Sequence, residues 1–292
     1  MKQNISIVGG DLRIVNLTKI LAKDGYTINT YGLENSIELN NLENIRINAN
    51  LEETIKESEI IISSIPLSKN DDEIYSPFSN KKIKLEELII KIKGKKLIAG
   101  GIKNETKEKI EKNNIEVIDL LKYEELTILN TISTAEGALQ IAMEETKKTI
   151  YNSNVLILGF GRVGKTTANL FKSIGANVYC EARKKEDLAW IKVYRYNAVA
   201  LEEIDKIINK FDIIINTIPS LIIDKKRLEL INKKCIIIDL ASAPGGVDFE
   251  EAKKQNINSI LALALPGKVA PETSAEFIYE ILYSILKTEE KI

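Results

Sequence analysis

Three glycines at a fixed spacing are the strongest chemical signal in this chain of 292 residues. Residues 154–171 read NVLILGFGRVGKTTANLF, which fits G-x-G-x-x-G between an apolar strand and a helix. The first glycine makes a tight turn, the second lets a pyrophosphate approach the backbone, and the third lets helix and strand pack closely. The helix N-terminus then offers free N–H groups to the phosphates. We therefore predict a dinucleotide site, with contacts from Gly159, Phe160, Gly161, Arg162, Val163 and Gly164.

The same segment also fits a second nucleotide motif. Gly159, four residues and then Gly164-Lys165-Thr166 match G-x-x-x-x-G-K-[ST], the P-loop. The apolar run that ends at Asp239 is of the kind that supplies a magnesium-binding Asp. Only the dinucleotide motif requires Gly161, which favours that interpretation. A P-loop nucleotidase or kinase is the alternative.

The segment after the next strand bears on which dinucleotide is bound. An NAD enzyme usually has an acidic residue about 20 residues past the glycine loop. In our register that position is Ala182, followed by Arg183 and Lys184. A small residue and two cations suit the 2′-phosphate of NADP, because Arg binds phosphate in a bidentate manner. A shift of one residue would put Glu181 on the ribose and favour NAD. NADP is the predicted cofactor, and NAD is the alternative.

Several absences exclude whole classes of chemistry. The chain has no His, so a Ser-His-Asp triad, a Cys-His pair and an H-E-x-x-H zinc site are excluded. It has two Cys, which we expect to be buried, and we predict no metal site. The net charge of -1 offers no reason to expect nucleic acid or an anionic membrane as partner. Without a long apolar run or a signal-peptide core, the cytoplasm is the expected location.

The elements that must position these residues follow a repeated pattern. Short apolar, β-branched runs alternate with amphipathic segments, and the two halves of the chain echo each other. This predicts an α/β protein with two doubly wound, parallel-sheet (Rossmann-like) domains that flank a cleft and are joined by long helices. We expect an N-terminal domain over 1–130, a connecting helix over 131–151, a dinucleotide domain over 152–270, and a helix over 271–292 that packs back on the first domain.

Polar residues at the ends of the predicted strands are candidates for the cleft, because ligands of open α/β sheets bind there. Thr217 and Pro219 are expected near the nicotinamide ribose, and Ser242 near the nicotinamide. We expect Ser64 and Arg13 on the substrate side. Ser133 or Thr134 would cap the connecting helix, which places Glu136 at its start, and Lys268 lies in a Pro/Gly-bracketed loop before the last helix. Surface or dipole roles are the alternatives for Arg13, Glu136 and Lys268.

Seven short segments, in order and spread over nearly the whole chain, resemble the A subunit of dipicolinate synthase from endospore-forming bacteria. They read VGGDLR (8–13), STAEGA (133–138), LGFGRVG (158–164), EARK (181–184), NTIPS (216–220), DLASAPGGVDF (239–249) and LPGKVAP (265–271). More distantly, the chain resembles the two-domain 2-hydroxyacid and alanine dehydrogenases. Those families rely on a catalytic His that this chain lacks.

The resemblance implies an NADP-dependent oxidation of dihydrodipicolinate, from 4-hydroxy-tetrahydrodipicolinate, to dipicolinate during sporulation. It implies that the partner is a flavoprotein-like B subunit and that production takes place in the mother-cell cytoplasm, and we expect a homo-oligomer. A dicarboxylate substrate needs cations and hydroxyl donors, and a proton must leave the ring. Within this interpretation Glu136 and Lys268 are the catalytic candidates, and Arg13, Ser64, Thr134 and Ser242 bind the substrate. A protein that binds dinucleotide without catalysing, and only completes its partner's site, is the remaining alternative.

Overall fold

The computed structural model describes residues 3–289 of the chain. It divides into two units, one formed by Met1–Thr127 with Ala270–Ile292 and the other by Ile128–Val269. We call them unit 1 and unit 2.

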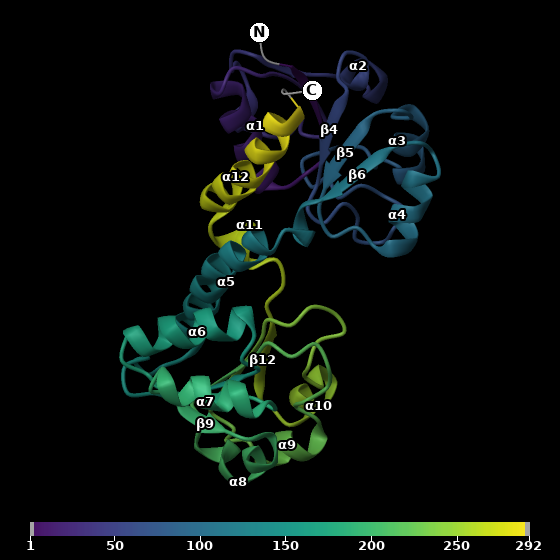
Figure 1. Cartoon of the computed structure of the whole chain (residues 1–292). Helices are drawn as coiled ribbons and strands as arrows, with labels where there is room; N and C mark the ends of the chain where they lie inside the picture. Colours follow the sequence, from purple (N-terminus) through teal and green to yellow (C-terminus); the bar gives the residue numbers. More distant parts are fainter. Residues whose placement is uncertain (1–2, 290–292) are drawn as a thin grey trace. The chain divides into compact units, whose positions relative to one another are not determined.

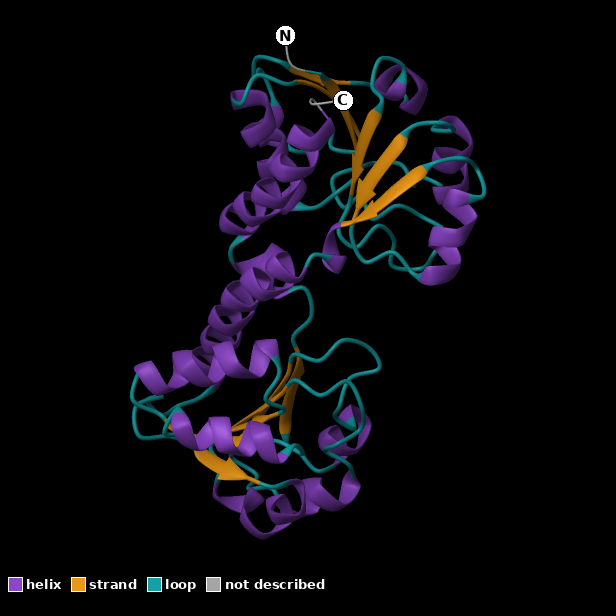
Figure 2. Ribbon diagram, viewed as in Figure 1, coloured by secondary structure: helices purple, strands orange, loops and turns teal. Residues whose placement is uncertain are grey.

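Unit 1 is a six-stranded parallel sheet with helices on both faces (Figures 1 and 2). The strand order is β3-β2-β1-β4-β5-β6. The strands are β1 (Asn4–Val8), β2 (Thr27–Tyr31), β3 (Ile45–Ile47), β4 (Ile60–Ser63), β5 (Lys96–Ala99) and β6 (Glu116–Asp119). The helices are α1 (Leu12–Lys23), α2 (Leu51–Ile55), α3 (Leu85–Lys91), α4 (Asn104–Glu111) and the C-terminal α12 (Pro271–Glu289).

Unit 2 repeats this topology, with strand order β12-β11-β10-β7-β8-β9. Its strands are β7 (Asn154–Leu158), β8 (Asn177–Glu181), β9 (Asn197–Val199), β10 (Ile213–Asn216), β11 (Ile236–Asp239) and β12 (Asn258–Leu261). Its helices are α6 (Arg162–Ser173), α7 (Lys185–Val193), α8 (Ile204–Ile207), α9 (Lys225–Leu230), α10 (Phe249–Lys254) and α11 (Leu265–Val269). Helix α5 (Glu124–Glu145) begins in unit 1 and continues in unit 2.

Strand β4 is apolar on both faces because helices cover both faces of its sheet. In β4, Ile60 and Ile62 pack in one core with residues of α1 and α12, while Ile61 packs in another with residues of α2 and α3. Alternate residues of a strand point to opposite faces, so a doubly covered sheet needs continuous apolar runs. The predicted fold class, two Rossmann-like sheets, is confirmed. In each sheet the strand order reverses beside the first strand, between β1 and β4 and between β7 and β10, and ligands bind at such points.

Helix α5 corrects the predicted connecting helix. It runs from Glu124 to Glu145 rather than over 131–151, because no Gly or Pro interrupts the chain between Glu124 and Ala135. Acidic residues in its first turn, Glu124 and Glu125, favour this start. Ser133, Thr134 and Glu136 therefore lie within the helix, so the prediction that they mark its start is wrong.

Helix α12 packs along α1 within unit 1, as Figure 1 shows with α12 in yellow. Ala275, Ile278, Leu282 and Leu286 of α12 are buried in the same core as α1. The Tyr279 hydroxyl donates to Asp24 Oδ2 at 2.6 Å. Of the segment predicted over 271–292, residues 290–292 lie outside the described part of the chain.

Candidate functional site

The turn between β7 and α6 has the geometry of a dinucleotide-binding loop. Gly159 has φ +91°, and a Cβ on it would lie 2.6 Å from Thr217 Oγ1. A Cβ on Gly164 would lie 2.1 Å from the Gly159 carbonyl oxygen, so only glycine lets α6 approach the turn. Gly161 is different, because a Cβ there would meet no atom within 4 Å. The open space beside Gly161 and the N–H groups of the helix that starts at Arg162 suit a pyrophosphate.

The P-loop alternative is contradicted by this turn. A P-loop Lys reaches the β- and γ-phosphates from the loop. Here α6 has already begun three residues earlier, at Arg162, and the Lys165 ammonium lies 5.4 Å from the centre of the Phe160 ring. Lys165 and Phe160 line a small hollow together with Tyr194 and Tyr196. Phe160 itself is 5% exposed, so only its backbone is available to a cofactor.

Asp239, the supposed magnesium ligand, is instead a buried structural acid. Its Oδ1 accepts hydrogen bonds from Asn216 Nδ2 at 2.8 Å and from the Ala241 N–H at 3.0 Å. Its Oδ2 accepts from the Gly246 N–H at 2.8 Å. These bonds hold the loop that carries the exposed Ser242 against the end of β10. Asp239 is fully buried and both of its carboxylate oxygens accept these bonds, so it has no role as a metal ligand.

The neighbouring strand end places Thr217 directly against the glycine turn. The Thr217 hydroxyl donates to the Leu158 carbonyl at 2.9 Å, and Pro219 is exposed two residues further on. Both therefore lie after the carboxyl end of β10, beside the point where the strand order reverses.

At the end of β8 the structure brings a carboxylate, rather than Ala182, to the glycine turn. Glu181 is 1% exposed, and its Oε2 accepts from the Gly159 N–H at 3.1 Å. Burial raises the pKa of the Glu181 carboxyl, against the lowering effects of the Gly159 hydrogen bond and of the positive charge of Arg183. Ala182 is buried, and its N–H donates to the Val199 carbonyl at 3.3 Å. Arg183 and Lys184 follow as exposed cations.

Glu136 and Lys268 lie on helices that touch. A Cβ on Gly137 of α5 would lie 3.0 Å from Val269 and 3.1 Å from Leu265, so glycine allows α11 to pack closely here. Glu136 precedes Gly137 in the chain and Lys268 precedes Val269, and both side chains are exposed. The structure places Lys268 on the short helix α11 instead of in a loop. The Thr134 hydroxyl donates back to the Asn130 carbonyl at 2.8 Å, as Thr does within a helix.

In unit 1 the structure assigns Arg13 to an internal ion pair. Its Nε and Nη2 donate to Asp11 Oδ1 and Oδ2 at 3.0 and 2.8 Å, and Nη2 also donates to the Ile65 carbonyl. Asp11 caps α1 by accepting from the Arg13 N–H at 3.1 Å. Arg13 is 6% exposed, so its main partners are Asp11 and the turn after β4. These bonds tie the start of α1 to the turn after β4.

Ser64 does not support the role predicted for it. The side chain is fully buried, and its hydroxyl donates to the Leu67 carbonyl at 2.9 Å. A hydroxyl that is buried and already bonded to its own turn is not presented to a substrate. The sequence predicts Ser64 on the substrate side because it follows a strand. In the structure the turn at residues 64–67 buries its side chain.

The corresponding turn of unit 1 is covered by its own chain. The Gly10 N–H donates to the Tyr75 carbonyl at 2.9 Å. A Cβ on Gly9 would lie 2.8 Å from Ile74 and 3.1 Å from the Tyr75 carbonyl oxygen. A pyrophosphate therefore has no approach to the backbone after β1. Of the two sheets, unit 2 carries the dinucleotide site.

Comparisons with known proteins agree with this division. Residues 4–121 match the family described as the N-terminal domain of the dipicolinate synthase A subunit. Residues 129–249 match the D-isomer specific 2-hydroxyacid dehydrogenase, NAD binding domain. The chain is 32% identical over 285 residues to the dipicolinate synthase A subunit of Bacillus subtilis (strain 168), and the match covers 97% of this chain and 95% of that protein.

The chain belongs to the family of dipicolinate synthase A subunits.

Two solved structures from this family have the same fold as the chain. The dipicolinate synthase A subunit of Bacillus halodurans is 29% identical with a TM-score of 0.87, covering 97% of each chain. The corresponding structure from Bacillus subtilis is 28% identical with a TM-score of 0.87, covering 100% of this chain and 98% of that one. Together with the NAD-binding domain, family membership points to a nicotinamide-dependent oxidoreductase.

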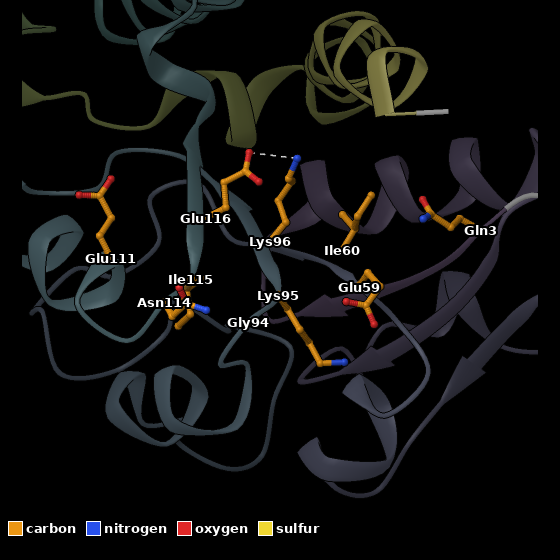
Figure 3. A pocket seen from close by; sticks show the side chains of 10 residues that line it. All are labelled: Gln3, Glu59, Ile60, Gly94, Lys95, Lys96, Glu111, Asn114, Ile115 and Glu116. Atoms are coloured by element: carbon orange, nitrogen blue, oxygen red, sulfur yellow. Dashed lines mark ion pairs between the residues drawn. The ribbon is translucent and has the colours of Figure 1, made fainter. Parts of the chain in front are cut away.

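A polar pocket in unit 1 lies at the amino ends of the strands of its sheet (Figure 3). It is lined by residues at the starts of β4, β5 and β6. Within it the Lys96 ammonium lies 3.0 Å from the Glu116 carboxylate, and the Lys95 ammonium donates to the Ile55 and Ser58 carbonyls at 2.8 and 2.7 Å. Ligands of such sheets bind at the carboxyl ends of the strands, so this pocket is not the candidate site.

Sequence reasoning missed the network around Asp239 and gave Asn216 no role of its own. The available signal was two polar residues, Asn216 and Asp239, each ending a wholly apolar strand. Their register as direct neighbours across β10 and β11 could be known only from the sheet.

Within residues 3–289, no group of three or more His, Cys, Asp or Glu side chains is placed to hold a metal ion. No helix in that range is both long and apolar enough to cross a membrane.

Proposed function

We propose that this chain oxidises dihydrodipicolinate, derived from 4-hydroxy-tetrahydrodipicolinate, to dipicolinate with a nicotinamide dinucleotide as oxidant. The observation that carries the proposal is the similarity to a dipicolinate synthase A subunit over 97% of the chain. The glycine turn of unit 2 supports it, because it has the open approach at Gly161 that a dinucleotide needs.

The residues that would hold the cofactor lie at the switch point of unit 2. The turn from Gly159 to Gly164 and the first N–H groups of α6 would bind the pyrophosphate, with Arg162 exposed beside them. Thr217 and Pro219 would border the nicotinamide ribose. When bound, the nicotinamide supplies the acceptor for the hydride that leaves the dihydropyridine ring. Arg183 and Lys184 would face the adenosine end, where they suit the 2′-phosphate of NADP.

Glu136 and Lys268 are the proposed catalytic residues. Loss of a hydride creates an aromatic ring, so the reaction needs positioning more than a strong base. The ring must still lose a proton, and the exposed Glu136 carboxylate is proposed to take it. Lys268, on the helix packed against Gly137, is proposed to hold a substrate carboxylate. Thr134 and Ser242 are proposed as further substrate contacts, whereas Arg13 acts through Asp11 and the turn at Ile65.

The Bacillus subtilis relative is named as one lettered component of its synthase, which supports a second component, the B subunit, for this chain too. We propose that the two proteins work together in the mother-cell cytoplasm during sporulation. The smaller partner would complete the enzyme without supplying the dinucleotide domain, since unit 2 already contains one.

The test is direct detection of dipicolinate by its ultraviolet absorption. The purified chain is mixed with freshly generated 4-hydroxy-tetrahydrodipicolinate and either NAD⁺ or NADP⁺, in the presence and absence of its B partner, and with Gly161→Asp as the matched inactive control. Dipicolinate with the wild type and none with Gly161→Asp is expected. No product under any condition, from a chain that binds a dinucleotide, would refute the substrate. Equal product from folded Gly161→Asp in the complex would show that this chain does not itself catalyse the reaction.

A further inference from the structure

Helix α7 presents apolar side chains to solvent that the fold of unit 2 does not use (Figure 1). Its inner side is anchored by Ile191, which is fully buried in the core of unit 2. On its outer side Trp190, Val193 and Tyr194 are 51%, 65% and 50% exposed. Residues three and four apart on a helix are neighbours, so these three side chains form one patch, which we call the α7 face. A contiguous apolar patch on a surface is typical of a contact with another molecule.

The aromatic rings of the α7 face hold one another and border a hollow. The rings of Trp190 and Tyr194 stack with their centroids 5.7 Å apart, and the Tyr194 ring lies 6.0 Å from that of Tyr196. Tyr194 and Tyr196 line a hollow of about 290 Å³ together with Phe160 and Lys165. Pockets for small molecules usually have roughly 300–1,000 Å³. The hollow therefore suits a single side chain of a partner protein, and rings that are already packed lose little entropy when it binds.

The charge around the α7 face favours an acidic partner. Residues 160–197 contain eight Lys and Arg against three Asp and Glu, a net charge of +5 within a chain whose net charge is -1. Lys165 lines the hollow, Lys192 lies on α7 and Arg195 follows the helix, and all three are exposed. A second copy would bring the same positive surface against itself, which opposes self-association through this face. A protein with carboxylates around an apolar anchor is the complementary partner.

We propose that the α7 face is the docking surface for an acidic surface of the B component of the synthase. An apolar or aromatic side chain of that partner fills the hollow, and carboxylates around it pair with Lys165, Lys192 and Arg195. Exposed Trp and Tyr side chains supply the binding energy, as they commonly do at the centre of protein interfaces. The inference rests on the proposed function, which supplies the partner, and it assigns that partner to unit 2.

The test measures the affinity of the full chain for its purified B partner by titration calorimetry. Trp190→Ala should raise the Kd roughly 10- to 100-fold, the effect of removing a central aromatic contact. Lys192→Glu should raise it too, and this effect should shrink at high salt, because salt screens exposed charges. The matched controls are Leu230→Ala and Lys226→Glu, which alter an exposed apolar side chain and an exposed cation of α9. Both controls should keep the wild-type Kd.

A second measurement reports on the face directly. Trp190 is the only Trp in the sequence, so labelling with fluorotryptophan gives this chain a single fluorine resonance at the α7 face. That resonance should shift when the unlabelled B partner binds.

The outcomes separate this inference from the proposed function. A complex that forms without moving the fluorine resonance, or that folded Trp190→Ala forms with wild-type affinity, would overturn the inference and leave the proposed function standing. A wild type that does not bind the B partner would overturn both the inference and the two-component enzyme, whereas dipicolinate made by the chain alone would still support its activity. A dimer of the chain alone that Trp190→Ala dissociates in sedimentation would assign the face to a second copy instead.

Discussion

Replacing Gly164 or Gly161 by alanine separates what the glycine turn does for folding from what it does for binding. In Gly164→Ala the new Cβ would lie 2.1 Å from a backbone oxygen, whereas real Cβ contacts lie beyond 3.0 Å. Helix α6 or the turn must then move by about 1 Å in a packed interior, which costs roughly 1–3 kcal/mol. The obstacle is backbone, not a flexible side chain, so we expect a loss of about 3 kcal/mol, at the upper end of that range.

Gly161→Ala should behave in the opposite way. Gly161 has φ -79°, which alanine adopts freely, and its Cβ would meet no atom within 4 Å. Its stability should equal that of the wild type or rise slightly. Its affinity for NADH should fall at least about tenfold, because the methyl group fills the space through which the pyrophosphate approaches the backbone.

The assay is thermal unfolding without nucleotide, followed by calorimetric titration with NADH. A loss of about 3 kcal/mol corresponds to a fall of roughly 6–12 °C in Tm for a unit of this size. Gly164→Ala that melts like the wild type would refute the close approach of α6 to the turn. Gly161→Ala that binds NADH like the wild type would refute the placement of the pyrophosphate.

Three further outcomes follow from buried groups. Arg13→Ala should lower the free energy of unfolding by about 3–5 kcal/mol in denaturant titration, because Asp11 keeps a largely buried charge without its partner; wild-type stability would contradict the ion pair. Native protein should not react with a thiol reagent at neutral pH, since burial raises the pKa of Cys235 to about 12 and that of Cys180 above its usual range. Both should react in denaturant, and rapid labelling of either in the native protein would be inconsistent with this burial. Burial raises the pKa of Glu181 in the folded state above the value of about 4.3 that it has in the unfolded chain. The wild type should therefore lose stability relative to Glu181→Gln as the pH rises from about 4.3 through the folded pKa. A difference in Tm between the two proteins that does not change with pH would disprove this.

The strands that the sequence reveals are those in the middle of each sheet. β1, β4, β7, β10 and β11 are apolar on both faces, since helices cover both. The hydrophobic pattern is weakest in the four strands at the sheet edges, β3, β6, β9 and β12, where residues such as Glu116 and Asn197 are exposed. An edge strand has less apolar surface to bury, so its hydrophobic pattern is weak.

The length of α5 shows a second limit of pattern reading. Ser133 and Thr134 are good N-cap residues, and their presence suggested a helix start. In the structure the helix has already begun at Glu124, and the Thr134 hydroxyl bonds back to the Asn130 carbonyl. A capping residue type indicates a helix start only where the preceding residues are not themselves helical.

The sequence by itself determined the fold class and the location of the dinucleotide turn. Both depend on short-range spacing: the glycines at 159, 161 and 164 act within one turn, and apolar runs specify buried strands. Tertiary structure alone decided what each polar side chain bonds to. It directs Arg13 to Asp11, closes Ser64 under its own turn and brings Glu181 to Gly159, 22 residues away in the chain. Such contacts depend on which strands become neighbours, and no local spacing in the sequence encodes that.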